Sequence, residues 1–339
     1  MVEPDMQLAL TEGLGLSTPE VELTAEVRER LRRYGQAAFS ENTRRAYQVA
    51  LRRYAAWCLE QQVDMLPSSP QTFAVYLTEL ADAGLSWSMV QTTVAAVKRT
   101  HGLAKLPSPT QDEDFRMVLR GIRRAITARQ HQARPISSKQ IKEVVEHLGD
   151  GLRDTRTKAI LCTGFAGAFR RSELVSLNRE DLKFDDERGL IIYLRRSKTD
   201  QEGAGRVIAI AYGARQATCP VRALKAWLKV VDAQMQLGPR DPVWLALYGS
   251  GSLVRLTTER MSDQAINRVV KGAIELIGGE PEGYSAHSLR AGFVTEAYRR
   301  GRLLPSIMKQ TGHKSADMMR RYLREEDAFR DNASEDIGL

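Results

Sequence analysis

Four short stretches in the second half of the chain hold residue types that bind anions, transfer protons and act as nucleophiles. Arginine binds oxyanions through a planar fork of donors, while lysine and histidine give or take protons. A tyrosine hydroxyl becomes a nucleophile once it loses its proton. The stretches are 168–174 (AFRRSEL), 196–199 (RSKT), 286–290 (AHSLR) and 311–315 (TGHKS), and Tyr322 follows nine residues after His313.

Each stretch has an ordinary structural interpretation when it is taken alone. Arg170 and Glu173 are three residues apart, the spacing of a helical salt bridge. A histidine on a helix is more often hydrogen-bonded than catalytic, and Tyr322 is one of ten tyrosines, most of which belong to cores or their boundaries. The order and the spacing of the four stretches together are what point to a shared site.

The first half of the chain predicts a small helical domain without strands. Apolar residues recur there at spacings of three and four, as in amphipathic helices. Residues 1–20 are rich in glycine, serine and threonine and predict a loose tail. The helices are expected to start near Ser40, Ser69, Ser88 and Asp112.

The second half predicts a mostly helical domain with one small antiparallel sheet. Residues 190–194 and 207–211 alternate like strands, and the loop between them carries Lys198. The fold class is therefore mainly α. Helices are expected from Ser137 onward and at 154–167, 170–178, 219–236, 262–277, 287–300, 305–311 and 316–325.

Charge is distributed unevenly along the chain. The net charge is +8, but residues 1–30 hold seven acidic and two basic residues, so this segment carries −5 and the remainder +13. A basic body favours a polyanionic partner, most commonly nucleic acid, although a merely soluble basic protein is the alternative.

The stretch 115–142 contains eight basic residues and no acidic one, which favours phosphate contact over an ordinary solvated helix face. Its middle has no apolar period and ends in Pro135, which indicates a linker. The predicted organisation is a tail at 1–20, a helical domain at 21–128, a linker at 129–136, a second domain at 137–330 and a tail at 331–339.

Cys58, Cys162 and Cys219 are odd in number and widely spaced, so the sequence predicts neither a disulfide framework nor a zinc site. No apolar run approaches the length of a membrane span, and the first residues lack the pattern of a signal peptide. We expect a cytoplasmic protein, associated with the nucleoid and encoded by a prokaryote, phage or plasmid.

The four stretches in this order resemble the tyrosine recombinase (phage integrase) family. The family pattern is [LF]-R-x-S-E-L, which selects Arg170 over its neighbour Arg171, then a hairpin lysine, H-x-x-R, and G-[HW] followed by a tyrosine nine residues later. The resemblance covers about residues 38–330, and residues 42–47 and 57–58 look like the family's core-binding domain. Residues 55–58, 81–85 and 319–324 look most similar to Cre-type recombinases.

The resemblance implies a metal-independent and ATP-independent transfer of DNA strands. Arg170 and Arg290 would bind the scissile phosphate, and His313 would donate a further hydrogen bond. Tyr322 would attack while His287 accepts or positions its proton, and Lys198 would protonate the leaving oxygen. Glu173 would orient His287 or Arg170. The sequence contains no carboxylate string typical of a metal pair and no phosphate-binding P-loop, so no metal and no cofactor is predicted.

Both domains are expected to contact double-stranded DNA, in a clamp joined by the basic linker. Gln264 and Arg268, on the helix that resembles the family's base-reading helix, are candidates for base contacts, with simple phosphate contact as the alternative. The other predicted DNA-binding residues are basic: Arg44, Arg45, Lys98, Arg99, Arg116, Arg120, Arg123, Arg124 and Arg134.

The resemblance also implies an assembly. Two protomers would bind each inverted-repeat target site, four would exchange strands between two sites, and the protein would be monomeric without DNA. Accessory DNA-bending proteins are a further class of partner. Two rival functions remain open: a type IB topoisomerase-like or telomere-resolving enzyme, and a DNA-binding regulator with this fold but no catalysis.

Overall fold

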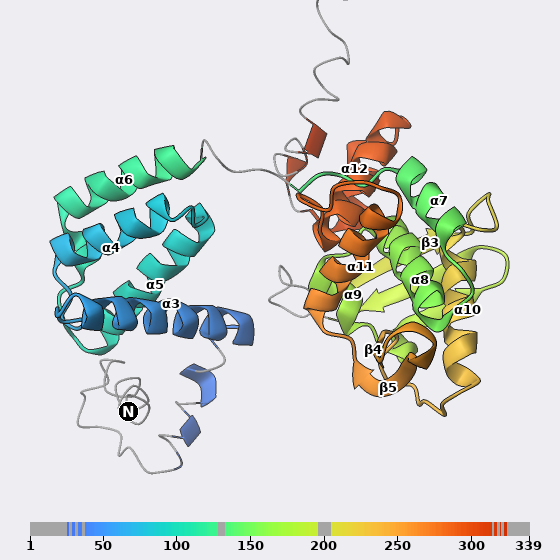
Figure 1. The fold of residues 1–339 in the computed structure, drawn as a ribbon, viewed down its shortest axis with the longest axis horizontal. Helices are drawn as coiled ribbons and strands as arrows, with labels where there is room; N and C mark the ends of the chain where they lie inside the picture. The colour runs from blue at the N-terminus through green and yellow to red at the C-terminus, as the bar shows by residue number, and fades with distance from the viewer. Residues whose placement is uncertain are drawn as a thin grey trace, which may run out of the picture. The chain divides into compact units, whose positions relative to one another are not determined.

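The chain divides into two compact units, residues 1–131 and 132–339 (Figure 1). In this computed structural model the described residues are 26, 29–30, 33–35, 38–127, 133–195, 205–313, 315–316, 319 and 322–323. The division falls inside the segment 129–136 that the sequence suggests as a linker. Each unit has its own buried apolar cluster.

The described part of the first unit is helical, as the apolar periodicity predicts. Ser40, Ser69 and Ser86 are the N-caps of the helices that start at residues 41, 70 and 87, and each accepts a hydrogen bond from a backbone N–H in the first turn. Tyr54 lies at the centre of the core, with its ring 5.2 Å from Phe73 and 4.7 Å from Tyr76. The elements are α3 (Glu41–Glu60), α4 (Pro70–Asp82), α5 (Trp87–Leu103), η1 (Pro109–Gln111) and α6 (Glu113–Thr127).

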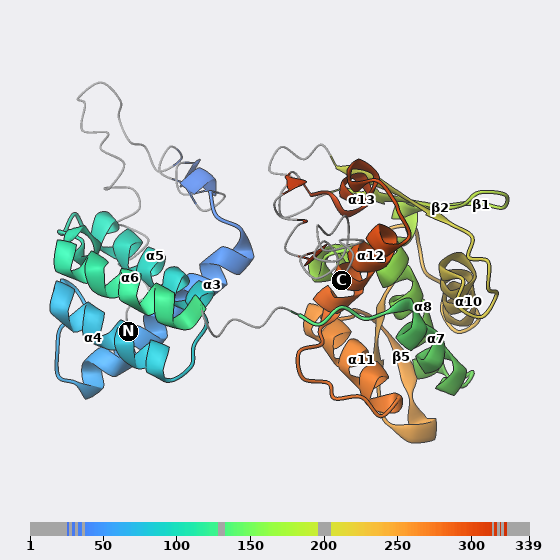
Figure 2. The ribbon, with the colours of Figure 1, turned by 90° about the horizontal axis from the view of Figure 1, so that it is seen from above.

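The second unit is built around α8 (Leu152–Gly167), which is buried along much of its length. It packs against α10 on one side and against α11 and α12 on the other (Figures 1 and 2). The remaining helices are α7 (Ser138–His147), α9 (Arg171–Ser176), η2 (Arg179–Asp181), α10 (Pro220–Asp232), η3 (Gly251–Leu253), α11 (Asp263–Leu276), α12 (Ala286–Arg299) and α13 (Leu304–Thr311). Of the helix expected over 316–325, the described residues 316, 319, 322 and 323 are helical.

Two antiparallel sheets occur in the described part of the second unit, where the sequence analysis expects one. The first has the order β1 (Leu182–Asp185), β2 (Gly189–Leu194), β3 (Arg206–Ala211) and contains the two predicted strands. The second pairs β4 (Leu245–Tyr248) with β5 (Arg255–Arg260). The strand β5 is largely exposed and begins and ends with arginine, so it lacks the apolar alternation that identifies a strand.

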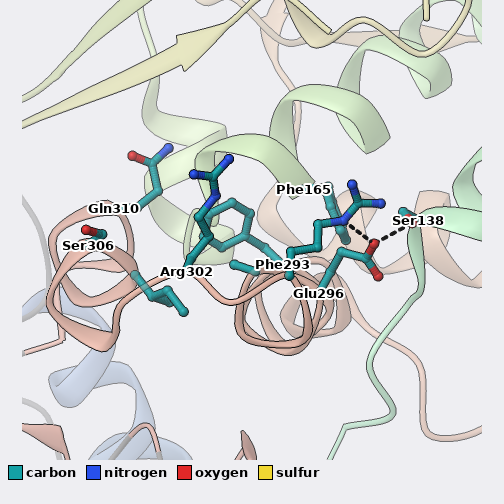
Figure 3. Close-up of a pocket in the computed structure, with 10 residues that line it drawn as sticks. Ser138, Phe165, Phe293, Glu296, Arg302, Ser306 and Gln310 are labelled. Carbon is teal, nitrogen blue, oxygen red and sulfur yellow. Dashed lines mark hydrogen bonds and ion pairs between the residues drawn. The ribbon is translucent and has the colours of Figure 1, made fainter. Parts of the chain in front are cut away.

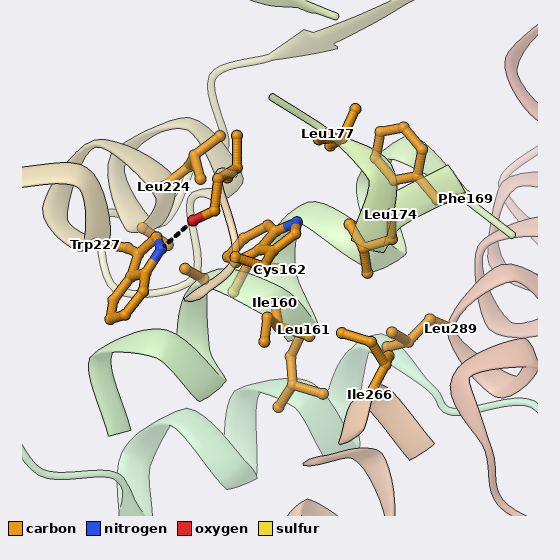
Figure 4. Close-up of a cluster of buried hydrophobic side chains, with 14 of the residues drawn as sticks. Ile160, Leu161, Cys162, Phe169, Leu174, Leu177, Leu224, Trp227, Ile266 and Leu289 are labelled. Atoms are coloured by element: carbon orange, nitrogen blue, oxygen red, sulfur yellow. Dashed lines mark hydrogen bonds between the residues drawn. The ribbon is translucent and has the colours of Figure 1, made fainter. Parts of the chain in front are cut away.

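The core of the second unit holds together the elements that surround the candidate site. Ile160 and Leu161 of α8 meet Leu174 of α9 and Leu289 of α12 (Figure 4). Trp227 of α10 is fully buried, and its indole N–H donates to the carbonyl of Val243 at 2.8 Å. The three helix segments that carry polar site residues are thus fixed to one another by apolar packing.

The three cysteines are buried and form no disulfide. Among the described helices, none is long and apolar enough to cross a membrane.

Close packing of α12 against the segment before α7 gives a test of this core. A Cβ atom added at Gly292 would lie 1.9 Å from the carbonyl oxygen of Ile136, so Gly292→Ala forces backbone apart. We expect it to lower the free energy of unfolding by roughly 1–3 kcal/mol. Gly272→Ala on the exposed face of α11 is the control, with nothing within 4 Å of the added atom. There alanine should stabilise by up to about 1 kcal/mol. Equal unfolding free energies of the two variants in urea titrations would contradict this packing.

Candidate active site

Tyr322 and His287 form a hydrogen-bonded pair. The Nε2 atom of His287 lies 2.7 Å from the hydroxyl of Tyr322, although the two residues are 35 positions apart. His287 belongs to the first turn of α12, where the hydroxyl of Ser285 accepts a bond from its backbone N–H. A neutral Nε2 in this position can take the proton that the phenol must lose in order to attack.

The surroundings of His287 favour the neutral form. Loss of hydration against the neighbouring protein, and then the charges of Arg290 and Arg170, lower the pKa of His287 below its ordinary value of 6.5. The residue nevertheless keeps an exposed edge. The imidazole is therefore ready to accept a proton at neutral pH.

Arg290 is the most deeply buried cation of the site, with 1% of its surface exposed. Its Nη1 donates to the carbonyl of Ala168 at 2.7 Å, and its Nη2 lies 2.9 Å from Nε2 of His313. Burial, followed by repulsion from Arg170, lowers the pKa of Arg290 to about 10. An arginine with a carbonyl and an imidazole as its partners has charge to offer to an anion.

The hydrogen bonds of His313 define its tautomer. Arg290 has only donors, so Nε2 of His313 must accept. The Nδ1 atom then carries the proton and donates to the hydroxyl of Thr311 at 2.8 Å, which in turn donates to the carbonyl of Ile307 at 2.8 Å. Burial, and then the charge of Arg290, lower the pKa of His313 to about 3. His313 is thus a neutral residue whose Nε2 accepts a hydrogen bond. This Nε2 can donate to a phosphate only after a proton is placed on it.

Arg170 is positioned by a helix start. The helix α8 ends in a turn with Ala168 in the left-handed conformation (φ 49°), after which Phe169 points into the core and Arg170 precedes α9. Glu173 accepts a bond from the backbone N–H of Arg170 at 2.9 Å and from its Nη1 at 2.6 Å. Of the two partners expected for Glu173, the structure provides Arg170; no hydrogen bond joins Glu173 to His287.

A third arginine, Arg206, also contacts Glu173. Its Nη2 lies 3.2 Å from Oε2 of Glu173, and the side chain of Glu173 is 1% exposed. Sequence reasoning missed this residue, because Arg206 lies just before the predicted strand 207–211 and belongs to none of the four motifs.

Five of the six predicted catalytic residues converge: Arg170, His287, Arg290, His313 and Tyr322. The rings of His287 and His313 lie 5.7 and 5.9 Å from that of Tyr322. The sixth, Lys198, lies outside the described residues. Among the described residues, no group of three or more His, Cys, Asp or Glu is placed to hold a metal ion.

The predicted DNA-binding arginines of α6 are partly engaged by an acidic residue. Arg116 and Arg120 pair with Glu113 at 3.4 and 3.2 Å. Glu113 stands two positions before the acid-free stretch 115–142. An analysis of that stretch alone therefore does not include this partner. Arg123 lies 5.9 Å from the ring of Trp87. Exposed pairs of this kind contribute little stability, so the arginines can change partner when a phosphate approaches.

The other predicted DNA-binding residues lie largely on exposed surfaces of their own units. Arg45 pairs with Glu41 at 3.2 Å, and the guanidinium of Arg99 lies 4.1 Å from the ring centre of Phe39. The backbone N–H of Arg134 donates to Gly283 at 2.8 Å. The exposed members of the set are Arg44, Arg45, Lys98, Arg124, Arg134, and Gln264 and Arg268 on α11.

The helix α11 is tied to both elements that carry site arginines. Arg171, next to Arg170, pairs with Asp263 at 2.8 Å. The side chain of Asn267 accepts from the backbone N–H of Ala286 at 2.9 Å, one residue before His287. The predicted DNA-reading face and the candidate catalytic residues are therefore mechanically connected.

A pocket of about 420 Å³ lies beside α12 and α13 (Figure 3). Phe165, Phe293 and Ile307 give it an apolar wall, and Arg302 and Gln310 lie at its edge. None of the five predicted catalytic residues that the structure describes lines it, so they form a separate site.

A mostly helical unit with arginines and histidines around the hydroxyl of a tyrosine agrees with the family resemblance of the sequence. The chain belongs to the Phage integrase family, whose sequence model matches residues 134–328. It is a tyrosine recombinase of the site-specific type, an enzyme that cleaves and rejoins DNA.

Curated relatives agree with this assignment. The chain is 35% identical over 301 residues to an integrase/recombinase XerD homolog of Selenomonas ruminantium, covering 87% of this chain and 84% of the relative. It is 24% identical over 304 residues to the recombinase Cre of Escherichia phage P1, covering 86% of each chain. Among solved structures, the XerH site-specific recombinase matches with a TM-score of 0.60 at 15% identity, over 96% of this chain and 94% of that one. At this level of identity, the match to XerH shows that the two chains share a fold.

The lowered pKa of His287 predicts the pH dependence of DNA cleavage. A general base must be unprotonated, so activity should fall as the pH drops through its pKa, and kcat/KM reports that pKa in the free enzyme. We expect the acidic limb of kcat/KM to lie below pH 6.5. His313, with a pKa of about 3, should not contribute to a limb between pH 4 and 7. The control is His287→Gln, which should be slow and lack this limb. An unchanged limb in that variant would contradict the assignment.

Proposed function

We propose that Tyr322 attacks a scissile phosphate of DNA, forming a 3′-phosphotyrosyl bond and releasing a 5′-hydroxyl. The observation that supports this most directly is the 2.7 Å contact between the tyrosine hydroxyl and Nε2 of His287 beside Arg290 and His313. A 5′-hydroxyl from a second DNA site then attacks the phosphotyrosine and restores the phosphodiester. Repeated on the other strands, this exchange passes through a Holliday junction.

Each side chain has a proposed part in this step. Arg170 and Arg290 bind the non-bridging oxygens and stabilise the charge that builds on phosphorus. His287 takes the proton of Tyr322, and Lys198 gives a proton to the departing 5′-oxygen. The bond to Tyr322 conserves the energy of the broken phosphodiester, so religation needs no ATP.

His313 completes the phosphate site in this proposal. Its Nε2 is the acceptor of Arg290 in the absence of DNA, and a phosphate would draw the Arg290 donor to itself. The neutral His313 can then donate to the phosphate once its proton is on Nε2 in place of Nδ1, with no change in its charge. Phosphate binding and donation by His313 are thus coupled.

The DNA partner and the assembly are part of the same proposal. The first unit would act as a core-binding domain and the second as the catalytic domain, closing around duplex DNA through the basic linker. The net charge of +8 supports a polyanionic partner. Among the structural neighbours, XerH is bound to a palindromic difH substrate and the Tn1549 integrase is in complex with circular intermediate DNA. Three buried cysteines without a disulfide fit a reducing cytoplasm.

The expected assembly is a tetramer on two inverted-repeat sites and a monomer without DNA. Light scattering after size-exclusion chromatography would give both masses. The probe is a duplex carrying the inverted repeat and spacer found beside the coding gene. A monomer-sized complex at micromolar protein on paired sites would argue against the tetramer.

A Tyr322→Phe variant tests the nucleophile. It removes one hydroxyl, so it should bind the inverted-repeat duplex with unchanged affinity and form no covalent adduct with it. The adduct of the wild-type protein is detected as a shifted band in a denaturing gel. Tyr248→Phe is the control, since Tyr248 is 79% exposed on β4, and it should react like the wild type. An adduct formed by Tyr322→Phe would overturn the assignment.

The same preparation separates the rival functions. A topoisomerase-like enzyme would relax supercoiled plasmid that lacks the inverted repeat, whereas the proposed recombinase should leave it supercoiled. A regulator without catalysis would bind the duplex and give no adduct with any variant.

A further inference from the structure

Arg206 lies at a junction of three elements of the candidate site. It is the first residue of β3, where it pairs in register with Leu194 of β2. Its Nη2 donates to Glu173 at 3.2 Å, and its Nη1 donates to the carbonyl of Gln310 in α13 at 2.8 Å. Only 17% of the side chain is exposed. Both ends of the guanidinium fork are therefore fixed.

Glu173 shares its charge between two arginines. Its Oε1 accepts from Nη1 of Arg170, and its Oε2 accepts from the backbone N–H of Arg170 and from Arg206. A carboxylate with 1% of its side chain exposed must be compensated within the protein. With Arg206 present, two guanidinium groups face one carboxylate, and one positive charge remains for a phosphate. Without Arg206, Arg170 alone would neutralise the charge of Glu173, and no net positive charge would remain for a phosphate.

Arg206 also supports the turn that carries His313. The helix α13 ends at Gly312, which adopts a left-handed conformation (φ 67°). A Cβ atom added there would lie 2.6 Å from Nη1 of Arg206, so the guanidinium packs directly against this turn. A cation near the last carbonyls of a helix is favourable.

The same end of α13 is held from a second direction. The side-chain amide of Gln310, seen at the pocket edge in Figure 3, donates to the carbonyls of Ala166 at 3.0 Å and Ala209 at 3.1 Å. Gln310 thus joins α13 to the end of α8 and to β3, while its carbonyl receives Arg206. The position of His313 relative to Arg170 depends on this junction.

We infer that Arg206 is a positioning residue for strand cleavage: by sharing Glu173 it leaves the charge of Arg170 available to the scissile phosphate, and by binding the Gln310 carbonyl it holds the His313 turn in place. The inference rests on the proposed function of this site. It assigns to Arg206 an action through Arg170 and His313, without contact with DNA.

The first experiment compares Arg206→Ala with the wild type in single-turnover cleavage of the inverted-repeat duplex. We expect a loss of about 100-fold in the rate, as for a small displacement of reacting groups. Because the inference gives Arg206 no contact with DNA, the Kd for the duplex should change by less than about threefold. Arg206→Lys keeps the charge near Glu173 but not the fork, so it should recover part of the rate. If Arg206→Ala unfolds at the assay temperature, the cleavage rate and the Kd of Arg206→Lys are compared with those of the wild type instead.

A change of substrate separates positioning of charge from loss of structure. The probe is the same duplex with a methylphosphonate at the scissile position, which lacks one negative oxygen and needs less positive charge during attack. The defect of Arg206→Ala relative to wild type should shrink to less than about tenfold on this DNA. Equal defects on both substrates would overturn the inference, since general damage to the fold slows both reactions alike.

A double-mutant cycle tests the route through Glu173. Once Glu173→Gln has removed the carboxylate charge, adding Arg206→Ala should cost much less than the loss of about 100-fold expected in the wild-type background, and the loss that remains reports the support of the His313 turn. Independent, multiplying effects would contradict the proposed route. The matched control is Arg188→Ala, which breaks an exposed arginine–carboxylate pair with Asp185 at 2.6 Å outside the site and should leave the rate unchanged.

Failure of the inference and failure of the proposed function give different results. If the wild-type protein forms no covalent adduct with the duplex, the proposed function is wrong. If the wild type forms the adduct and Arg206→Ala cleaves at the same rate, the proposed function stands and the role of Arg206 is wrong.

Discussion

The structure of the candidate site depends on keeping several guanidinium groups close together before any phosphate is bound. Arg290 is buried with a carbonyl and an imidazole as its partners, and repulsion from Arg170 helps to lower its pKa to about 10. The charge of Arg290 also helps to lower the pKa of His313 to about 3. A site of like charges is unfavourable by itself, and an anion placed among them relieves it. This is preorganisation: the fold holds the like charges together in advance, as the proposed attack on a phosphate requires.

Rigid elements make this repulsion tolerable. The polar residues of the site come from helix ends: the ends of α8 and α13 and the starts of α9 and α12. At a helix end, backbone N–H and C=O groups have no partner within the helix and can bind side chains. Ala168 in its left-handed turn gives its carbonyl to Arg290, and Glu173 gives its carboxylate to Arg170 and Arg206. The apolar packing of α8 against α11 and α12 holds these ends in register.

Tyr322 is attached to the second unit by a cluster of its own. Met319 and Leu323, on either side of Tyr322, are buried against Val294 of α12 and Ile307 of α13. These contacts link Tyr322 to the helix that carries His287 and Arg290 and to the helix that precedes His313.

The sequence alone predicted most of the helices, the strands β2 and β3 and, through its resemblance to a known family, the residues that converge on Tyr322. Helix periodicity, serine caps and the spacings R-x-x-E and H-x-x-R are local patterns, and a local pattern is complete within a few residues. Tertiary structure alone decided the roles of Arg206 and Glu113, the acceptor state of His313 and the pairing of β4 with β5. Arg206 and Gln310 are 104 positions apart, and Arg290 and Ala168 are 122 apart. Contacts of this kind are chosen by the packing of whole elements, which no single stretch of sequence contains.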